Sequence, residues 1–375
     1  MELEKLEDQL RIHDVIGNGQ TGRRGLGYGH TRGKRRVVAS ESSKQRRQRM
    51  VELMKVETEQ QRLEILHENK MQNSWLSYAW LDGMMAKDMT WGKMLFQYSD
   101  RLLKFVLNAQ LNTLPSPDNL RRWNRYKDGA CGLCGTKGVT LAHILAGCKW
   151  VRNCEHRLPR EDRYTWRHNC VLAVLTKSVK AKVIEINAAP LVERSTHQAF
   201  VKAGASVRRR ARSAPLQQGF GLLSEARDWE CDFDLPEWRS ADSKQLVFPH
   251  DVCATSLRID GYLVSRSKRI CVAGPKLTAP MEENVAAWAV SKRTKYSEIQ
   301  KDAAVGWRVH VVTLEVGSRG WIPPAFRQSL LQLGFTTAES KSLADKCQLV
   351  ARRCSYIIWL NRFNREFQPW RISAE

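Results

Sequence analysis

No stretch of the sequence stays apolar for long, and no window approaches the roughly eighteen consecutive apolar residues of a membrane-spanning helix. The first residues, Met1 to Asp14, are acidic and amphipathic, whereas a secretory signal is basic and then apolar. We therefore expect no membrane partner, no signal peptide and no transmembrane segment.

Acidic residues are scarce relative to basic ones, with 39 Asp and Glu against 61 Lys and Arg and a formal net charge of +22. An excess of this size favours a polyanionic partner, because lysines and arginines that neutralise phosphates release condensed counterions. Hydrophobic residues make up 42% of the chain and 13 residues are tryptophans, which excludes a wholly disordered protein. Its 375 residues suffice for two domains, or for two with a small module between them. We expect DNA, RNA or both as partners, and a nuclear location.

Signatures of several enzyme classes are missing. The sequence has no Gly-x-Ser-x-Gly elbow that would hold a nucleophilic serine. Glycines occur at Gly17-Asn-Gly19 and Gly25-Leu-Gly27, but neither pair lies between an apolar strand and a helix, so no phosphate-binding loop is expected. No apolar strand carries a Tyr- or Phe-x-Asp-Asp turn, so the paired aspartates of a polymerase are not found.

The ten cysteines are scattered through a long chain, which favours thiols and metal ligands over disulfides. One subset has metal-ligand spacing: C-x2-C-x8-H-x4-C, formed by Cys131, Cys134, His143 and Cys148. Three thiolates and an imidazole can surround Zn2+ and leave no position for water, so the ion would be structural. The alternatives are that Cys154 or His156 replaces one ligand, or that four buried residues lie close together by chance.

Basic and aromatic residues alternate around this motif. Cations can contact phosphates and aromatic rings can stack on unpaired bases, so the surroundings favour nucleic-acid binding. For Trp123 and Trp150 a place in the small core of the metal module is an equal alternative, and Trp166 and His168 can pack against that module. The candidate nucleic-acid-binding residues are Arg121, Arg122, Arg125, Lys149, Arg152, Arg163, Arg167 and His168.

Apolar residues recur at intervals of three and four in the first half of the chain, which predicts helices. These are expected from Arg49 through Gln61, from Trp91 onward, and over Asn119 to Tyr126, Tyr164 to Lys182 and Leu191 to Val201. Past a basic linker the pattern changes to short alternating segments, which predict strands. Strands are expected over Ala226 to Asp234, Gln245 to Phe248, Leu257 to Val264, Arg269 to Ala273 and Trp307 to Glu315, with helices at Glu282 to Ala303 and Ala338 to Phe363.

Ten short segments follow one another in an order that is informative as a whole. They are Thr21 to Gly27, Leu111 to Trp123, the Cys/His motif, Tyr164-Thr-Trp-Arg-His-Asn169, Asp228-Trp-Glu230, Lys244 to Pro249, Ser256 to Asp260, Leu277 to Asn284, Lys295-Tyr296 and Val316 to Gly320. Together they resemble the region downstream of the polymerase in non-LTR retrotransposon polyproteins of the type that ends in a restriction-like endonuclease. The resemblance covers roughly residues 20 to 336, in the family's order.

The resemblance implies a mixed α+β or α/β chain: a helical N-terminal region with a CCHC zinc knuckle, then a restriction-endonuclease-like α/β domain. The segment Tyr164 to Asn169 resembles a motif that is associated with nucleic-acid binding in these elements. The expected organisation is a flexible basic arm (1–50), a thumb-like helical region (51–128), the knuckle with a basic helical region (129–200), a basic linker (201–220), the endonuclease-like domain (221–336) and a C-terminal helix (337–375).

The resemblance also implies a catalytic site, which this sequence matches incompletely. Asp260 matches the first acid, with Ile259 in place of the usual proline, but Lys276 stands where the second acid is expected. Gly274-Pro275 is expected to interrupt this core strand, because proline cannot donate a ladder hydrogen bond. Glu282 or Glu283 can in principle replace the second acid, although an acid in a first helical turn is also favoured by the helix dipole. The candidate catalytic residues are Asp260, Glu283, Lys292 and Lys295, with Arg293 as a further base; Mg2+ is a cofactor only if this site is active.

Three functions follow as hypotheses. The first is a nucleic-acid-binding C-terminal fragment of a retrotransposon-derived polyprotein, which is structured by zinc and has a degenerate endonuclease site. The second is an active Mg2+-dependent endonuclease that nicks target DNA. The third is a protein-interaction scaffold whose arginines are solvated.

Overall fold

The computed structural model describes residues 43–68, 91–125, 129–152, 162–190, 221–235, 246–278, 281 and 284–369. Contacts divide the chain into two units, residues 1–77 and 78–375. The expected helix Leu191 to Val201, the linker 201–220 and most of the basic arm 1–50 lie outside the described residues. Among the described helices, none has the length and apolar composition that crossing a membrane requires.

The first unit contains one described helix, α3 (Ser43–Glu68). The helix expected from Arg49 is present and begins six residues earlier. The apolar side chains of α3 whose burial is described are exposed, among them Val56 (64%) and Ile65 (67%). Good helix formers, with pairs such as Arg62 and Glu59 (3.4 Å), therefore account for α3 locally.

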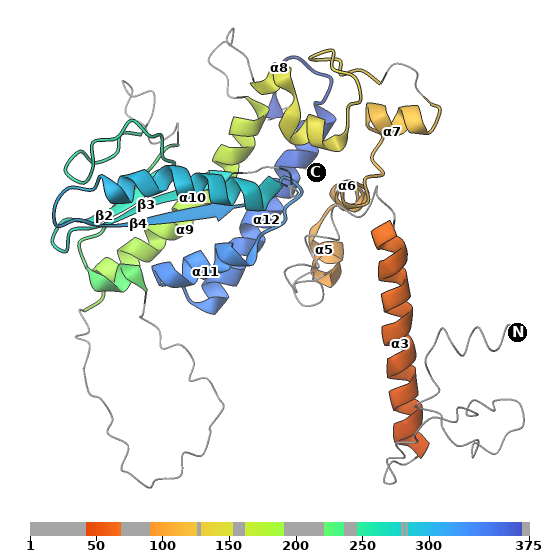
Figure 1. Cartoon of the computed structure of the whole chain (residues 1–375), viewed down its shortest axis with the longest axis horizontal. Helices are drawn as coiled ribbons and strands as arrows, with labels where there is room; N and C mark the ends of the chain where they lie inside the picture. Colours follow the sequence, from red (N-terminus) through yellow and green to blue (C-terminus); the bar gives the residue numbers. More distant parts are fainter. Residues whose placement is uncertain are drawn as a thin grey trace, which may run out of the picture. The chain divides into compact units, whose positions relative to one another are not determined.

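The second unit contains a four-stranded mixed sheet, which confirms the expected mixture of helix and sheet (Figure 1). The strands are β1 (Glu230–Phe233), β2 (Gly261–Ser265), β3 (Ile270–Thr278) and β4 (Arg308–Glu315), and they lie in sequence order. The pairs β1–β2 and β2–β3 are antiparallel, whereas β3 and β4 are parallel. The parallel pair is joined by helix α10 (Val285–Lys301), the crossover that such a pair requires.

Strand β3 continues through the dipeptide that was expected to interrupt it. Ala273 pairs with Val311 and Lys276 pairs with Thr313. Between these two pairs β3 advances by three residues and β4 by two, so β3 contains one extra residue. The extra residue forms a bulge at Gly274-Pro275, where Gly274 has φ +120° and proline has no ladder bond to donate. The expectation of an interrupted strand is thus corrected to a bulged one. Of the expected strand Gln245 to Phe248, residues 246–248 are an irregular segment whose Phe248 is buried.

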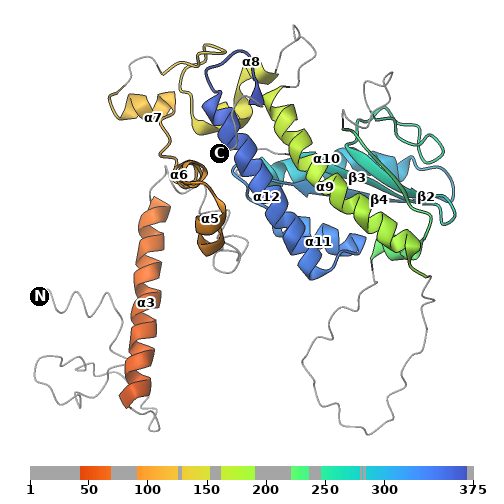
Figure 2. The ribbon, with the colours of Figure 1, turned by 180° about the vertical axis from the view of Figure 1, so that it is seen from behind.

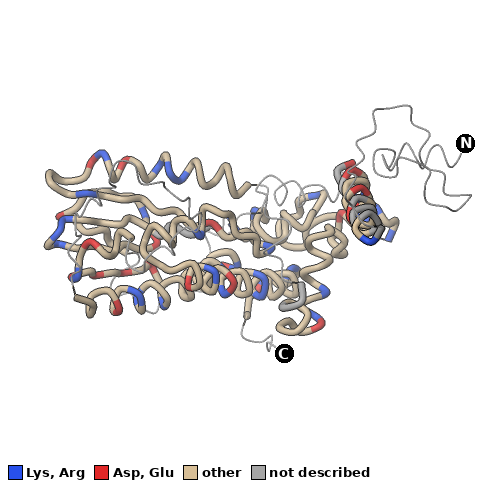
Figure 3. Tube along the Cα trace, turned by 90° about the horizontal axis from the view of Figure 1, so that it is seen from below, with Lys and Arg blue, Asp and Glu red and all other residues tan. Residues whose placement is uncertain are grey.

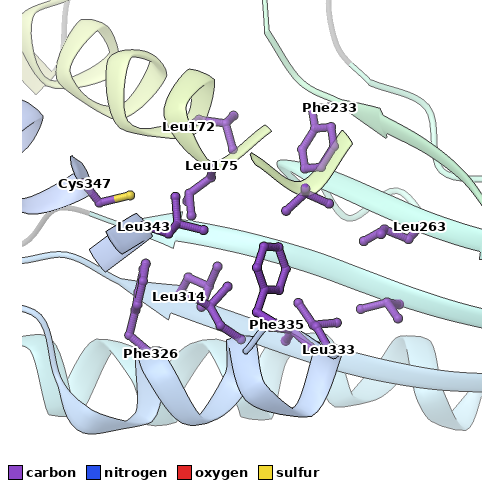
Figure 4. Packing of buried hydrophobic residues seen from close by; sticks show 14 of the residues in the cluster. Leu172, Leu175, Phe233, Leu263, Leu314, Phe326, Leu333, Phe335, Leu343 and Cys347 are labelled. Carbon is purple, nitrogen blue, oxygen red and sulfur yellow. The ribbon is translucent and has the colours of Figure 1, made fainter. Parts of the chain in front are cut away.

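Helices cover both faces of the sheet. Residues of α9 (Arg163–Ala188), α11 (Pro324–Leu333) and α12 (Thr337–Leu360) form one large core with β2, β3 and β4. Side chains from these elements meet in Figure 4, among them Leu175, Leu314, Phe326 and Leu343. On the other face Tyr296 and Ile299 of α10 pack on Val264, Cys271 and Ala273.

A second core lies beside the sheet domain. It is built from α5 (Trp91–Gln97), α6 (Asp100–Gln110) and the segment that leads into the π-helical turn η1 (His143–Gly147). Two short helices, α7 (Pro117–Arg122) and α8 (Lys149–Arg152), flank this turn. Ile358 and Trp359 of α12 belong to the second core, while Leu343 and Cys347 of the same helix belong to the first. Helix α12 thus joins the two cores, and α9 runs beside it in both views (Figures 1 and 2).

Candidate metal centre and the adjoining sheet edge

Four side chains expected to share a metal ion converge. One ligand atom from each of Cys131, Cys134, His143 and Cys148 lies within 4.8 Å of the others. The Sγ atoms of Cys131 and Cys148 are 3.9 Å apart, near the ~3.8 Å edge of a tetrahedron with Zn–S bonds of about 2.3 Å. Sγ of Cys134 lies 3.4 Å from Nε2 of His143. Cys154 and His156, the alternative ligands, lie outside the described residues.

Local structure explains the convergence. Cys131 and Cys134 flank a tight turn in which the Gly135 N–H donates to the Cys131 carbonyl (2.8 Å), and Gly135 has the left-handed φ of +69° that glycine adopts without strain. A bridge between Ala130 and Lys137 closes this turn. His143 then begins η1, whose last residue immediately precedes Cys148.

The ionisation of Cys134, His143 and Cys148 fits a bound cation. Burial raises the pKa of the Cys148 thiol to about 12, and the neighbouring cysteines add to this. Burial also raises the pKa of Cys134, but hydrogen bonds from Thr136 and the other two thiols outweigh it and bring the value to about 7. Burial lowers the pKa of His143, which keeps its imidazole neutral and able to donate a lone pair. Clustered thiols that resist becoming anions together are the groups that a divalent cation deprotonates on binding.

Tyr164 ties this cluster to helix α9. Its hydroxyl accepts the Cys148 N–H (3.2 Å) and lies 3.0 Å from the carbonyl of Ile144 and 3.2 Å from that of His143. Burial raises the pKa of this phenol, so the hydroxyl keeps its proton for the carbonyls. The helix itself begins after Asp162, whose carboxylate accepts the N–H groups of Tyr164 and Thr165.

Two of the candidate nucleic-acid-binding arginines are buried. Arg163 is 3% exposed and donates to the carbonyls of Asn361 (2.7 Å) and Asn364, while Arg167 is 1% exposed and donates to the hydroxyl of Ser355 (2.9 Å). Both guanidinium groups therefore hold the C-terminal segment against α9, and the surface contact expected of them is corrected to a packing role. The partners lie almost two hundred residues away in sequence, so no local pattern indicated this.

The other candidate lysines and arginines, which are close in sequence to the Cys/His group, lie on the surface. Arg125, Lys149 and Arg152 are exposed, as are Arg121 and Arg122, which share Asp118 at 3.3 and 3.4 Å. Trp150 packs with Leu133, Cys148 and Val151 in the small core of the module, whereas Trp123 is 45% exposed. Elsewhere in this unit Lys and Arg alternate with Asp and Glu (Figure 3).

A second group of candidate site residues lies at one end of the strands of the sheet. Asp260 immediately precedes β2, and the antiparallel pairing of β2 with β3 puts it at the edge where β3 and β4 end. Asp260 is 3% exposed, and its Oδ2 lies 3.0 Å from Nε2 of His168. The predicted catalytic acid and the predicted nucleic-acid-binding histidine therefore form a pair, although they lie 92 residues apart in the chain.

Glu315, the last residue of β4, is an acid that the sequence analysis missed. It is 1% exposed, and its Oε1 has no hydrogen-bond partner within the described part of the chain. Burial raises the pKa of its carboxyl, against the charges of Lys292 and Arg293 and a hydrogen bond from Thr313. The available signal was an acid directly after the apolar and β-branched run Val311-Val-Thr-Leu314.

The remaining predicted catalytic residues have different environments. Lys292 is 7% exposed on the buried side of α10, close enough to Glu315 to act on its charge. Lys295 is exposed, with Nζ 5.9 Å from the centroid of the Tyr296 ring. Glu283 lies outside the described residues, and the backbone of Lys276 pairs with Thr313 in β3. Asp260 is thus hydrogen-bonded to His168, and the burial that raises the pKa of Glu315 disfavours its anion, so neither carboxylate is well suited to hold Mg2+.

No model of a protein family matches the chain, and a search of curated proteins likewise finds no match.

Proposed function

We propose that this chain is a nucleic-acid-binding protein in which a structural Zn2+ ion holds the Cys131–Cys148 module in place. The convergence of three thiols and one imidazole, with exposed cations close to them in sequence, is the observation that carries the proposal. Four protein ligands complete a tetrahedral zinc shell and leave no position for a reactive water, so the ion would act on folding.

The exposed cations supply the contact with the nucleic acid. Arg125, Lys149 and Arg152 have solvent-exposed side chains close in sequence to the metal ligands, and α8 is only four residues long, so its position depends on the metal module. Lysines and arginines held on a rigid module bind phosphates with less loss of side-chain freedom than a flexible arm would. The large positive charge of the chain adds long-range attraction to a polyanion.

The proposal includes a retrotransposon origin, a nuclear location and a sheet domain that resembles a restriction-like endonuclease without its activity. The 3.0 Å contact of Asp260 with His168 and the burial of Glu315, which raises the pKa of its carboxyl, support the last point, because neither acid is left as an isolated anion for a metal. A plasmid-nicking assay with Mg2+ or Mn2+ tests it. We expect no nicking; nicking by the purified chain that disappears in Asp260→Ala would establish the endonuclease instead.

The main experiment measures zinc content and binding together. We expect one Zn2+ per chain, and fluorescence-anisotropy titrations with single- and double-stranded oligonucleotides in which affinity falls steeply as salt rises. The triple variant Arg125→Ala, Lys149→Ala, Arg152→Ala should lower the slope of log K against log salt by about 2 for single strands, at ~0.7 per phosphate contact.

A control variant removes the same charge elsewhere. Lys177, Lys341 and Lys346 are exposed on α9 and α12, and replacing them with alanine should leave the slope nearly unchanged. A chain that binds no zinc, or whose weak binding ignores salt, would overturn the proposal and favour a protein-interaction scaffold.

A further inference from the structure

Helix α10 exposes a large aromatic ring beside basic residues. Its inner side is formed by Val285, Ala289, Tyr296 and Ile299, which are buried, whereas Trp288 is 47% exposed. Tryptophan is a costly residue to leave in water, and an exposed one commonly marks a binding surface. The sheet core beneath α10 is complete without this ring, because the described members of that core are other residues.

Trp288 and Lys295 lie on the same flank of α10. They are seven residues apart, close to two helical turns, with Ser291 between them on the same flank. This spacing corresponds to about 10.5 Å along the helix axis, or roughly three nucleotides of a stacked strand at ~3.4 Å each. Lys295 is exposed, and its Nζ lies over the Tyr296 ring, 5.9 Å from the centroid. The flank thus offers a stacking surface and a positioned ammonium group at a distance that a short single strand spans.

The start of α10 is anchored to the core beneath the metal module. Met281, four residues before the helix, is buried with Val139, Leu141 and Leu145, and the Ser318 hydroxyl donates to its sulfur (2.9 Å). This anchor fixes the helix end that carries Trp288 relative to the module whose cations are proposed to bind phosphates. Both surfaces therefore belong to one packed unit.

We propose that the Trp288–Lys295 flank of α10 binds single-stranded nucleic acid, with an unpaired base stacked on Trp288 and a phosphate on Lys295. The proposal rests on the proposed function and names the form of nucleic acid that this surface takes. Charge favours this occupant over a protein partner, since Arg293 and Lys295 are exposed on α10 and could meet phosphates. Beside Trp288, the exposed apolar residues of this helix are Val290 and the small Ala286 and Ala287.

The test uses the full, zinc-loaded chain and a single-stranded oligonucleotide that contains 2-aminopurine. Binding should quench the fluorescent base, because it stacks on the indole. Trp288→Ala should weaken single-strand binding by about 5- to 100-fold, as loss of one base–aromatic stack does, and should remove the quenching, while Trp288→Phe retains most of both. Lys295→Ala should lower the salt slope by about 0.7.

Matched controls lie on the same helix. Val290 is 62% exposed and Lys301 is exposed, both away from the Trp288 flank, so Val290→Ala and Lys301→Ala should bind like the unaltered chain. The inference is overturned if the Trp288→Ala variant binds the oligonucleotide and quenches its fluorescence like the unaltered chain. It is also overturned if the substitution changes only the oligomeric state in solution, because the surface would then be a protein contact. If the unaltered chain binds no nucleic acid, the proposed function fails; if it binds only duplex, the inference alone fails.

Discussion

The Tyr164 hydroxyl offers the sharpest test of how the metal module is held. Tyr164→Phe removes one oxygen and leaves the ring in place. That oxygen is the acceptor for the N–H of Cys148 and lies within hydrogen-bond distance of the Ile144 and His143 carbonyls. Cys148 is 2% exposed, so its N–H would find no water in exchange. The perturbation thus acts on the backbone of two metal ligands without touching a ligand atom.

The expected effect follows from the bonds that are lost. A buried donor left without a partner costs about 1–3 kcal/mol, and the bond to a carbonyl contributes about 1 kcal/mol more, of which relaxation recovers a part. We therefore expect a loss of ~2 kcal/mol, which corresponds to about 30-fold weaker retention of Zn2+ by the folded chain.

A chelator competition assay measures this loss directly. The zinc-loaded chain is titrated with a chromogenic chelator, and Tyr164→Phe should release zinc at a chelator concentration about 30-fold lower. Tyr356→Phe is the matched control, because Tyr356 packs its ring on Phe105 (centroids 5.3 Å apart) far along the chain from the ligands. Release curves for Tyr164→Phe that coincide with those of the unaltered chain would refute the reasoning.

Three further predictions concern the fold around the site. Arg167→Met should lower the free energy of unfolding by about 3 kcal/mol, since it removes a buried hydrogen-bonded charge, yet change the nucleic-acid affinity of the folded chain less than about twofold. Denaturation and anisotropy on the same sample check this, and a large affinity loss without destabilisation would contradict it. Thr336→Ala should cost about 1 kcal/mol in denaturant titrations, because Thr336 and Glu339 form the capping box of α12. Burial raises the pKa of Glu315, so its contribution to stability is present at acid pH and is lost as pH rises through the folded-state pKa. Glu315→Gln should therefore stabilise the chain more at pH 8 than at pH 4, and equal effects at both would be inconsistent with a buried acid.

Local features of the site could be predicted from the sequence. The metal ligands lie within eighteen residues, from Cys131 to Cys148, and a short turn followed by one helical turn determines their approach. Helices α9 and α12 and the strand β4 also agree with the expected ranges, because their apolar periodicity extends over two turns or more, or over a full strand. The helical region expected from Trp91 onward is present as two helices, α5 and α6, because Ser99 caps the start of the second.

Features that depend on distant parts of the chain could not be predicted from the sequence. Arg163 and Arg167 look like surface residues of a basic helix, and only the return of the C-terminal segment buries them. Gly274-Pro275 is a breaker by composition, but a parallel neighbour strand accommodates it as a bulge. Glu315 and Lys292 are placed side by side by the crossover between β3 and β4, which no spacing in the sequence encodes.

Helix α12 has a consequence for any attempt to divide this protein. Its first half lines the core under the sheet and its second half lines the core under the metal module, so each half-helix completes a different hydrophobic interior. A version truncated before Thr337 would expose both interiors to water at once. Neither the metal module nor the sheet domain should therefore fold on its own, or within another protein, unless α12 is included in the fragment.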